Sequence, residues 1–490
     1  MSLHNRKSLE PYIKDDVEFF KHQVDGVRRM WNMPSFLLAD DMGLGKSVQA
    51  LVVFAIHCQK MKQNYGADST MLIVCPPTLK DNWVDEIEKF TGFKYVKLHG
   101  SPKIREEQMG EFIMMQGSKI LIVNYEQIKA HIAQINSIGF DCVTADEAHK
   151  LKNPQSQRTK AFQRIRADRS FMLTGSPLLN NVHELWVILD RIQPKQWGTY
   201  WGFCQKYCVY GGFGGKQIIG VKNEPQLVSA LQHVMIRRLK SEVLDLPEVQ
   251  IIPRIVDLTP LQKKLYDQAI TDLVIDIGSK EMELENPATK FMRLKQICGT
   301  TASLLESGED SSAKLDLAIE DAEEICSKGN KLVVFTQFRS VHAAYVKRFQ
   351  AAMASVPVFE LHGDVKQELR QGIVKSWGAT QGPAVIVCML QVASIGLNMT
   401  AARYCQFIDK DFVPALNQQA IDRLNRIGAS KTQAVQVLEY RARGTVETRV
   451  ESILKVKKNI FETVVEQKAM QNRIARELLS DIRAAVARVA

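Results

Sequence analysis

Short apolar runs rich in β-branched residues alternate with amphipathic stretches of helical length along most of the chain. They form two series, namely Phe36–Ala39, Met71–Cys75, Ile120–Val123, Asp141–Ala145 and Phe171–Leu173, and then Leu332–Phe335, Val385–Cys388, Tyr404–Ile408 and Ala434–Leu438. Consecutive apolar positions mean that both faces of each strand are buried, which is typical of a parallel sheet covered by helices on both sides. The pattern therefore predicts an α/β protein with two such sheets.

A different region, roughly 185 to 310, separates the two series. It is rich in aromatic residues and contains the glycine cluster 211–215 and a helical stretch at Leu261–Ile277. No strand precedes the glycine cluster and no Gly-Lys-Ser follows it, so we expect a hairpin or a surface loop there and not a phosphate loop. Three prolines, Pro247, Pro253 and Pro260, indicate an extended segment that crosses between domains.

Length and composition narrow the class of protein. A chain of 490 residues with 45% hydrophobic and 24% charged residues is typical of a globular protein with two or three domains. No apolar run approaches the roughly 18 residues that span a bilayer, and the charged N-terminus lacks the apolar core of a signal peptide. We expect no membrane segment, and a cytoplasmic protein in a bacterial or phage setting or a nuclear one in a eukaryote.

The nine cysteines are scattered along the chain without a CxxC pair. Several lie inside apolar runs, where a reduced cysteine packs as a small hydrophobe. Cys204 and Cys208, with His233 downstream, match no zinc template. This pattern favours a reducing compartment and argues against a zinc site.

Basic residues outnumber acidic ones, 64 against 54, for a net charge of +10. The last fifty residues contain eleven basic and six acidic side chains, so their net charge of +5 is half of the total. A basic balance fits a polyanionic partner such as nucleic acid, although helices rich in Lys and Arg also serve solubility alone.

A phosphate-binding loop is predicted where the first apolar run meets a helix. The run is followed by Asp40-Asp41-Met42-Gly43-Leu44-Gly45-Lys46-Ser47. In such a loop the backbone amides bind phosphate oxygens, Lys46 reaches the β- and γ-phosphates, and Ser47 ligates magnesium. Asp40 stands in place of the first glycine of the generic motif, and the short GxGK[ST] string also occurs by chance.

Asp146 and Glu147 follow another apolar run, one hundred residues after Lys46. At the end of a strand beside a phosphate loop, Asp146 would hold magnesium through water and Glu147 would orient and deprotonate the attacking water. A lone Asp-Glu pair often only caps a helix, but the upstream loop favours the catalytic interpretation. Leu173-Thr174-Gly175-Ser176-Pro177, at the next strand end, suits a relay between this site and bound nucleic acid.

Further strings complete a resemblance to the Swi/Snf family of helicase-like, DNA-stimulated ATPases in helicase superfamily two, over about residues 15 to 450. They are Phe20-Lys21-His22-Gln23, Val74-Cys75-Pro76-Pro77-Thr78-Leu79, Leu98-His99-Gly100, Asn124-Tyr125-Glu126, Ile236-Arg237-Arg238-Leu239-Lys240, Val334-Phe335-Thr336-Gln337-Phe338, Leu361-His362-Gly363, Ala393–Asn398 and Gln418–Gly428. The resemblance implies two RecA-like P-loop lobes. It divides the chain into an N-terminal lobe (1–192), helical insertions with an interlobe linker (193–310), a C-terminal lobe (311–442) and a basic helical tail (443–490).

The resemblance also implies roles for ATP and magnesium. Gln23 would read adenine, while the phosphates would be bound by Asp41, Met42, Gly43, Leu44, Gly45, Lys46 and Ser47. Magnesium would be held by Ser47 and Asp146, and the hydrolytic half-site would comprise Lys46, Asp146 and Glu147. Arg423 and Arg426 would arrive from the second lobe as arginine fingers, typically worth about 10³ to 10⁵ in rate. Alternatively, Arg423 forms a salt bridge with Asp422 or another acid.

DNA contacts follow from the same resemblance. Thr78, His99 and Asn124 on the first lobe, and Thr336, Gln337 and Ser394 on the second, would face the phosphate backbone, although each is also an ordinary turn residue. The tail would brace the lobes or touch DNA. Residues 409–413 replace the usual Trp-Asn before proline, and Asn425 and Ala429 replace the usual His and Gln. These departures lie near the expected arginine fingers. We therefore expect the coupling between DNA binding and ATP hydrolysis to differ from that in other members of the family.

The expected function is an ATP-driven translocase on double-stranded DNA that remodels or anneals branched DNA, acting as a monomer without an obligate protein partner. The layout resembles bacterial, phage or fork-remodelling members of the family. One alternative is a strand-separating helicase or the motor subunit of a restriction system. Another is a DNA-binding scaffold without hydrolysis, against which the intact Lys46, Asp146, Glu147 and Arg426 argue.

Overall fold

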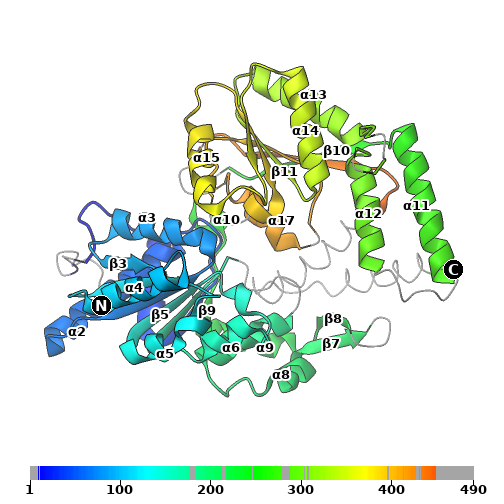
Figure 1. Cartoon of the computed structure of the whole chain (residues 1–490). Coiled ribbons are helices and arrows are strands. Elements are labelled where there is room, and N and C mark those ends of the chain that lie inside the picture. The colour runs from blue at the N-terminus through cyan, green and yellow to red at the C-terminus, as the bar shows by residue number, and fades with distance from the viewer. Residues whose placement is uncertain are drawn as a thin grey trace. The chain divides into compact units, whose positions relative to one another are not determined.

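The computed structural model describes residues 9, 12–175, 182–211, 217–245, 247–278, 287–302, 304–305, 308–393, 397–411, 413–425, 430 and 432–448. The chain divides into two compact units, of which the first ends at Val243 and the second begins at Leu244 (Figure 1). Each unit contains a parallel sheet flanked by helices, which confirms the predicted α/β class. Residues 193–243 thus belong to the first unit and 244–310 to the second, whereas the four-part division by function remains a proposal.

The first sheet has seven strands in the order β3-β4-β2-β5-β6-β1-β9, and every neighbouring pair is parallel. They are β1 (Ser35–Leu38), β2 (Thr70–Cys75), β3 (Lys94–Lys97), β4 (Lys119–Asn124), β5 (Phe140–Asp146), β6 (Ala167–Leu173) and β9 (Met235–Ile236). All five runs of the first predicted series form strands, and β3 and β9 are additions at the two edges.

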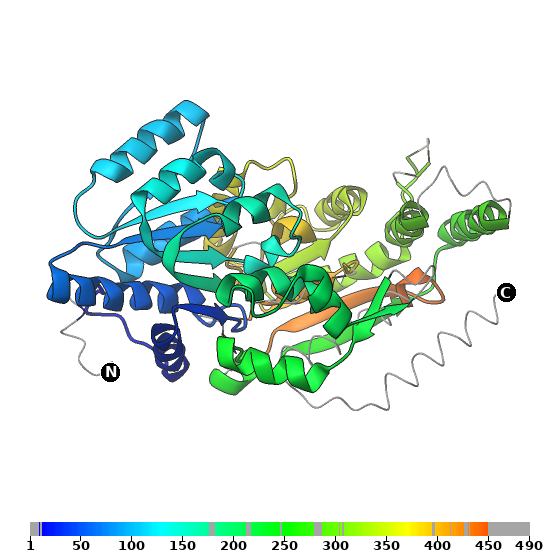
Figure 2. The ribbon, with the colours of Figure 1, turned by 90° about the horizontal axis from the view of Figure 1, so that it is seen from below.

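Helices cover both faces of this sheet. They are α1 (Lys21–Asn32), α2 (Lys46–Tyr65), α3 (Lys80–Phe90), α4 (Pro102–Met114), α5 (Ile128–Ile138), α6 (Gln157–Gln163) and α7 (Trp186–Ile192). One face packs its buried residues against α4, α5, α6 and α7, while α1 and α2 lie on the opposite side (Figure 2). Because α2 is buried continuously from Val48 to Cys58, its first turn is held rigidly at the end of β1.

An insertion follows α7 and returns the chain to the sheet at β9. It contains α8 (Tyr200–Tyr207), the antiparallel strands β7 (Cys208–Gly211) and β8 (Gln217–Val221), and α9 (Glu224–Val234). The two strands flank the glycine cluster, as expected for a hairpin, and 212–216 lie outside the described residues. The short helix α10 (Lys240–Val243) ends the first unit.

The second sheet has six parallel strands in the order β10-β15-β14-β11-β13-β12. They are β10 (Gln250–Val256), β11 (Leu332–Thr336), β12 (Val358–Leu361), β13 (Val385–Met389), β14 (Tyr404–Phe407) and β15 (Gln436–Ala442). The proline-punctuated segment expected to cross between domains is extended, but it forms the edge strand β10. An edge strand tolerates Pro253 because its outer side forms no hydrogen bonds with another strand, so the missing N–H of proline costs little there.

The helices of the second unit are α11 (Pro260–Gly278), α12 (Pro287–Gly299), α13 (Ala313–Ser327), α14 (Arg339–Ala352), α15 (Gln367–Ala379), α16 (Leu390–Ala393) and α17 (Pro414–Ile421). Helices α13 and α14 pack on one face of the sheet, and α15 and α17 pack on the other. Helices α11 and α12 pack together beside the end of β15, where Tyr266 and Cys298 meet Ala442.

All nine cysteines are buried and reduced. Within the described ranges, no group of three or more His, Cys, Asp or Glu side chains is arranged to hold a metal ion. The same part of the chain contains no helix that is both long and apolar enough to cross a membrane.

Candidate nucleotide site and nucleic-acid face

The predicted phosphate loop lies between the carboxyl end of β1 and the first residue of α2, Lys46. Two of its residues have positive φ, Gly43 at 83° and Gly45 at 75°, a conformation that favours glycine. A side chain at Gly45 would also collide with Gln23, whose Nε2 lies 2.3 Å from the position of an added Cβ. The loop therefore turns tightly onto a helix N-terminus, where backbone amides can bind an anion.

Lys46 donates from Nζ to two carbonyls of its own loop, those of Asp40 at 2.9 Å and Asp41 at 3.1 Å. Burial lowers the pKa of this lysine, while the negative charges of Glu147 and Asp146 oppose that shift. An ammonium group held in this way within the loop is suited to exchange a carbonyl for a phosphate oxygen.

Asp146 ends β5 and Glu147 follows it. Asp146 accepts hydrogen bonds from Trp83 Nε1 at Oδ2 and from the amide of Glu147 at Oδ1, both at 2.9 Å. Burial, together with the charge of Glu147, raises the pKa of Asp146 to about 7. Glu147 has a φ of 51°, a left-handed conformation that is costly for a residue with a side chain and that concentrates at functional sites.

These side chains fit a divalent cation. Two adjacent carboxylates repel each other in a buried setting, and a bound cation would relieve that repulsion. Ser47, in the first turn of α2, supplies a hydroxyl on the phosphate-loop side. Carboxylate and hydroxyl oxygens are ligands that magnesium accepts, usually together with water and phosphate.

His149 connects this pair of acids to the string Leu173–Pro177, for which the sequence predicts a relay. Its Nδ1 lies 3.3 Å from Glu147 Oε2 and 3.1 Å from the hydroxyl of Thr174, which follows β6 and is fully buried. This contact is compatible with the predicted relay, which remains a proposal, and residues 176–181 lie outside the described residues.

Gln23 anchors the start of α1 to the phosphate loop. Its Oε1 accepts from the amide of Phe20 at 3.0 Å, and its Nε2 donates to the carbonyl of Leu44 at 3.3 Å. A pocket of about 630 Å³ opens beside this turn and is lined by Phe20, Lys21, His22, Val24, Asp25, Arg28, Arg238, Glu242 and Val243. The position of Gln23 is compatible with its predicted contact to adenine, which remains a proposal.

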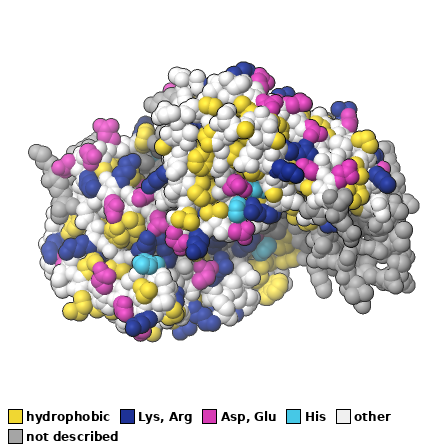
Figure 3. All heavy atoms as spheres, turned by 45° about the horizontal axis from the view of Figure 1, so that its top comes forward, with side chains coloured by type: hydrophobic (Ala, Val, Ile, Leu, Met, Phe, Trp, Pro, Cys, Tyr) yellow, Lys and Arg dark blue, Asp and Glu magenta, His cyan; other side chains and the backbone are white. Residues whose placement is uncertain are grey.

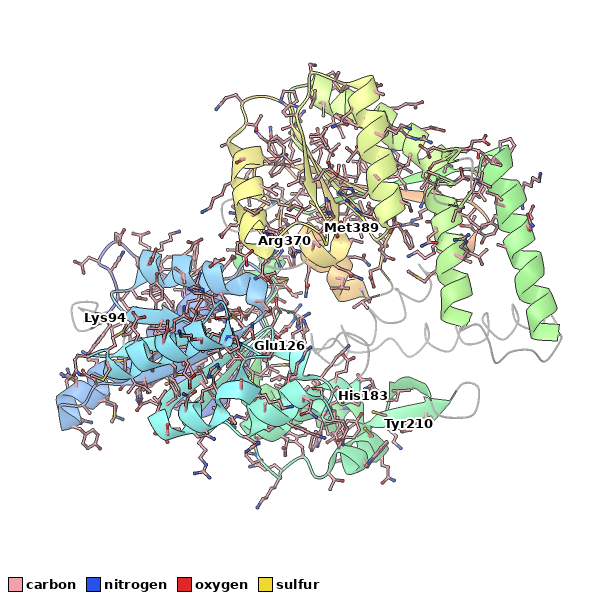
Figure 4. All side chains as sticks on the ribbon, in the orientation of Figure 1. Lys94, Glu126, His183, Tyr210, Arg370 and Met389 are labelled. Carbon is pink, nitrogen blue, oxygen red and sulfur yellow. The ribbon has the colours of Figure 1, made fainter. Side chains whose placement is uncertain are left out.

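The three nucleic-acid residues predicted on the first unit follow three neighbouring strands. Thr78 follows β2, His99 follows β3 and Asn124 ends β4, so all three lie at the carboxyl edge of the sheet. The hydroxyl of Thr78 is buried and makes no hydrogen bond. Glu126, in the same loop as Asn124, is labelled in Figure 4 and pairs with Arg158 at 3.3 Å.

A buried lysine that the sequence analysis missed connects these loops. Lys80 donates to the carbonyl of Leu98 at 2.5 Å and to Gln127 Oε1 at 2.8 Å. Gln127 in turn exchanges two hydrogen bonds with Asn124, each 2.9 Å long. Nothing in the local sequence marked Lys80, because its partners come from the two neighbouring loops.

In the second unit, Thr336 and Gln337 lie at the end of β11. Thr336 is fully buried and its hydroxyl donates to Asp409 at 2.6 Å, while the amide of Gln337 donates to the same carboxylate at 2.8 Å. Lys295 adds a bond to Gln337 Oε1 at 3.2 Å. The structure thus brings both predicted residues together around Asp409, and their contact with DNA remains a proposal.

Arg423 follows α17 and is buried. Arg426, Ser394 and the tail beyond residue 448 lie outside the described residues. On the face shown in Figure 3, Lys and Arg side chains are interspersed with Asp and Glu over the described surface.

Comparisons with known proteins match two domain profiles and several relatives to this sequence. The profile of the SNF2-related domain matches residues 22–302, and that of the helicase conserved C-terminal domain matches residues 317–428. An uncharacterized ATP-dependent helicase of Mycoplasma pneumoniae is 29% identical over 95% of this chain and 43% of its own length. Human TATA-binding protein-associated factor 172 is 27% identical over 94% of this chain and 29% of its own length.

Among solved structures, the SWI2/SNF2 ATPase core of Sulfolobus solfataricus in complex with dsDNA is 25% identical, with a TM-score of 0.43, and the match covers 94% of this chain and 95% of that chain. The chain spans about a quarter to a half of the length of the curated relatives that it matches. With more than half of its residues in the first matching domain, the chain belongs to the SNF2-related family of ATP-dependent, helicase-like proteins.

Proposed function

We propose that the chain hydrolyses ATP and couples hydrolysis to movement along double-stranded DNA. The observation that supports this most strongly is the proximity of Lys46, at the head of α2, to the carboxylates of Asp146, which ends β5, and of Glu147, which follows it, since their charges shift the pKa of Lys46 and of Asp146. An ammonium, a pair of acids and a helix N-terminus are the parts that phosphoryl transfer to water requires.

In this proposal, different residues of the first unit bind the nucleotide, the metal and the attacking water. Lys46 binds the β- and γ-phosphates, Gln23 contacts adenine, and Ser47 with Asp146 holds magnesium. The metal, when bound, neutralises charge on the transferred phosphoryl group. Glu147 orients the attacking water and accepts its proton, and Nδ1 of His149 lies 3.3 Å from its carboxylate.

The remaining groups come from both units, with the arginines on the second. Arg423 and Arg426 stabilise the charge of the transition state as arginine fingers. Thr78, His99 and Asn124, with Thr336, Gln337 and Ser394, contact the phosphate backbone of DNA. Because such contacts carry no sequence information, movement along the duplex is independent of sequence. The proposal includes remodelling or annealing of branched DNA by this movement.

ATP turnover measured without DNA and with single-stranded, blunt duplex and forked DNA tests this function. We expect strong stimulation by duplex or forked DNA, and loss of turnover in Lys46→Ala. DNA binding without any turnover would contradict the proposal and favour a scaffold.

A strand-separating helicase is the second candidate, because several relatives carry the word helicase in their names. It predicts stimulation by single strands alone and release of a labelled strand from a tailed duplex. The translocase predicts that a short annealed strand stays in place, while a triplex-forming strand is displaced from the duplex.

A further inference from the structure

Asp40 stands where a generic phosphate loop has glycine, and its side chain has a specific partner. The carboxylate is fully buried and accepts two hydrogen bonds from Arg238, Nε to Oδ1 at 2.9 Å and Nη2 to Oδ2 at 2.6 Å. Gln49, in the second turn of α2, adds a bond to Oδ2 at 3.2 Å. A bidentate contact between an arginine and a carboxylate is among the stronger and more directional ion pairs in proteins.

The neighbouring arginine holds the rest of the loop. Arg237 pairs with Asp41 at 2.7 Å and donates to the carbonyls of Ala39 at 2.7 Å and Gly175 at 2.9 Å. The backbone takes part as well, since the amide of Asp41 donates to the carbonyl of Arg238 at 3.0 Å. Two consecutive arginines thus bind two consecutive aspartates, across separations of 196 residues for Arg237 and Asp41 and 198 residues for Arg238 and Asp40.

The same two aspartates present their carbonyls to Lys46. Their side chains therefore face the arginines while their backbone faces the lysine that would bind phosphate. Any displacement of Arg238 must move the loop, because a buried carboxylate cannot give up its partner without a large desolvation cost.

The end of the Arg238 side chain is packed closely against α1. Gly26, on the buried side of α1, lies so close that an added Cβ would be 1.8 Å from Gln49 Oε1 and 2.7 Å from Arg238 Nη2. A glycine in the middle of a helix costs roughly 1 kcal/mol relative to alanine, so its presence here is explained by this close approach.

We propose that Asp40 and Arg238 form a positioning pair that holds the phosphate loop in its nucleotide-binding conformation and ties it to residues 237–243, the last segment of the first unit before the chain continues into the second. The inference rests on the proposed nucleotide site but not on DNA translocation. It gives the interlobe stretch a role in nucleotide affinity.

The test measures the affinity of the full chain for a fluorescent ADP, with thermal unfolding recorded for each variant. Arg238→Lys keeps the positive charge but loses the bidentate contact with Asp40. Asp40→Asn keeps the shape of the side chain but loses its negative charge. We expect each to weaken ADP binding by about tenfold, a coupling typical of residues that act through another residue. In the double variant the second change should cost little more than the first.

Two further variants separate positioning from simple destabilisation. Gly26→Ala leaves both charges in place and favours the helix, yet it crowds Gln49 and the end of Arg238, so we expect weaker ADP binding with a smaller fall in melting temperature than either charge variant causes. Asp141→Asn removes a partly buried carboxylate at the other end of β5, where it accepts from Thr70 at 2.7 Å and His57 at 3.3 Å. It should lower the melting temperature and change ADP affinity by less than about twofold.

The outcomes are distinct. Unchanged ADP affinity in Asp40→Asn, Arg238→Lys and Gly26→Ala would overturn the positioning pair, as would an equal loss in Asp141→Asn. If the unmodified chain failed to bind ADP at all, the nucleotide site itself would be refuted, and the pair with it. ADP binding without DNA-stimulated turnover would refute the translocase while leaving the pair intact.

Discussion

Trp83 is the side chain that donates to the carboxylate of Asp146, the proposed magnesium ligand. Its indole Nε1 donates to Asp146 Oδ2 at 2.9 Å, and the ring is 1% exposed. In Trp83→Phe this oxygen loses its donor and the carboxylate loses its orientation. We expect the magnesium concentration for half-maximal ATP turnover to rise by about tenfold, because partners of metal ligands commonly matter to that extent.

Trp377 offers a matched control for this change. It is also fully buried and donates from Nε1, to the carbonyl of Ala384 at 3.2 Å, but it lies in the second unit. Trp377→Phe should destabilise the protein to a similar degree without changing its magnesium requirement. Equal magnesium dependence in both variants would exclude an orienting role for Trp83.

Glu147 permits a separation of binding from chemistry. In Glu147→Gln the side chain keeps its size but can no longer accept a proton. We expect turnover to fall by about 10² to 10⁴, the usual contribution of a general base, while ADP affinity stays within about twofold. A fall in affinity that matches the loss of turnover would show instead that the residue holds the nucleotide.

At this scale, sequence reasoning identified the groups that stand in contiguous strings, Lys46 with its loop and Asp146 with Glu147. It could not identify Trp83 or Arg238 as their partners, because these contacts span 63 and 198 residues and depend on how the sheet folds. The only local signal was Asp40 in place of glycine, which shows that the loop needs a carboxylate but not which arginine binds it.

At the scale of elements, the loops after β2, β3 and β4 depend on the buried Lys80. Burial lowers the pKa of Lys80 to about 8 from 10.5, with repulsion from Lys97 and Arg105 in the same direction and with Cys75 and Asp81 opposing it. The unfolded chain keeps this proton up to about pH 10.5, whereas the folded chain releases it above about pH 8. Folding is therefore favoured as the pH rises between these two values.

Lys80→Met should remove this dependence. We expect the stability of the unmodified protein relative to the variant to rise by about 2 kcal/mol between about pH 8 and about pH 10, measured by urea unfolding at each pH. Parallel pH profiles for the two proteins would mean that Lys80 keeps an ordinary pKa and that its burial is incomplete in solution.

The elements that sequence reasoning missed share a physical cause. Strands β3 and β12 lie at sheet edges and are only partly buried, so they lack the continuous apolar run that marks a central strand. Strand β9 has two residues, and β10 contains a proline. The central strands were predicted correctly because burial on both faces requires apolar residues at every position.

At the scale of the whole molecule, a net charge of +10 and the proposed contacts to the phosphate backbone predict that DNA affinity depends strongly on salt. If six to ten phosphates are neutralised, duplex affinity should fall by roughly 10³ or more between about 50 and about 200 mM salt. Fluorescence anisotropy with two unrelated duplexes would measure this, and the two curves should coincide. A strong preference for one duplex would contradict a sequence-independent track.

The pairing of β9 with β1 has a consequence for synthesis on the ribosome. Leu38 aligns with Ile236, so β1, which leads into the phosphate loop, can pair with β9 only after a further 198 residues have been translated. At 5 to 20 residues per second, the delay is roughly 10 to 40 seconds. During that time β1 is an open edge, and the two aspartates of the loop have no arginines. A nascent chain interrupted before this point would contain the whole nucleotide motif and yet lack the contacts that shape it.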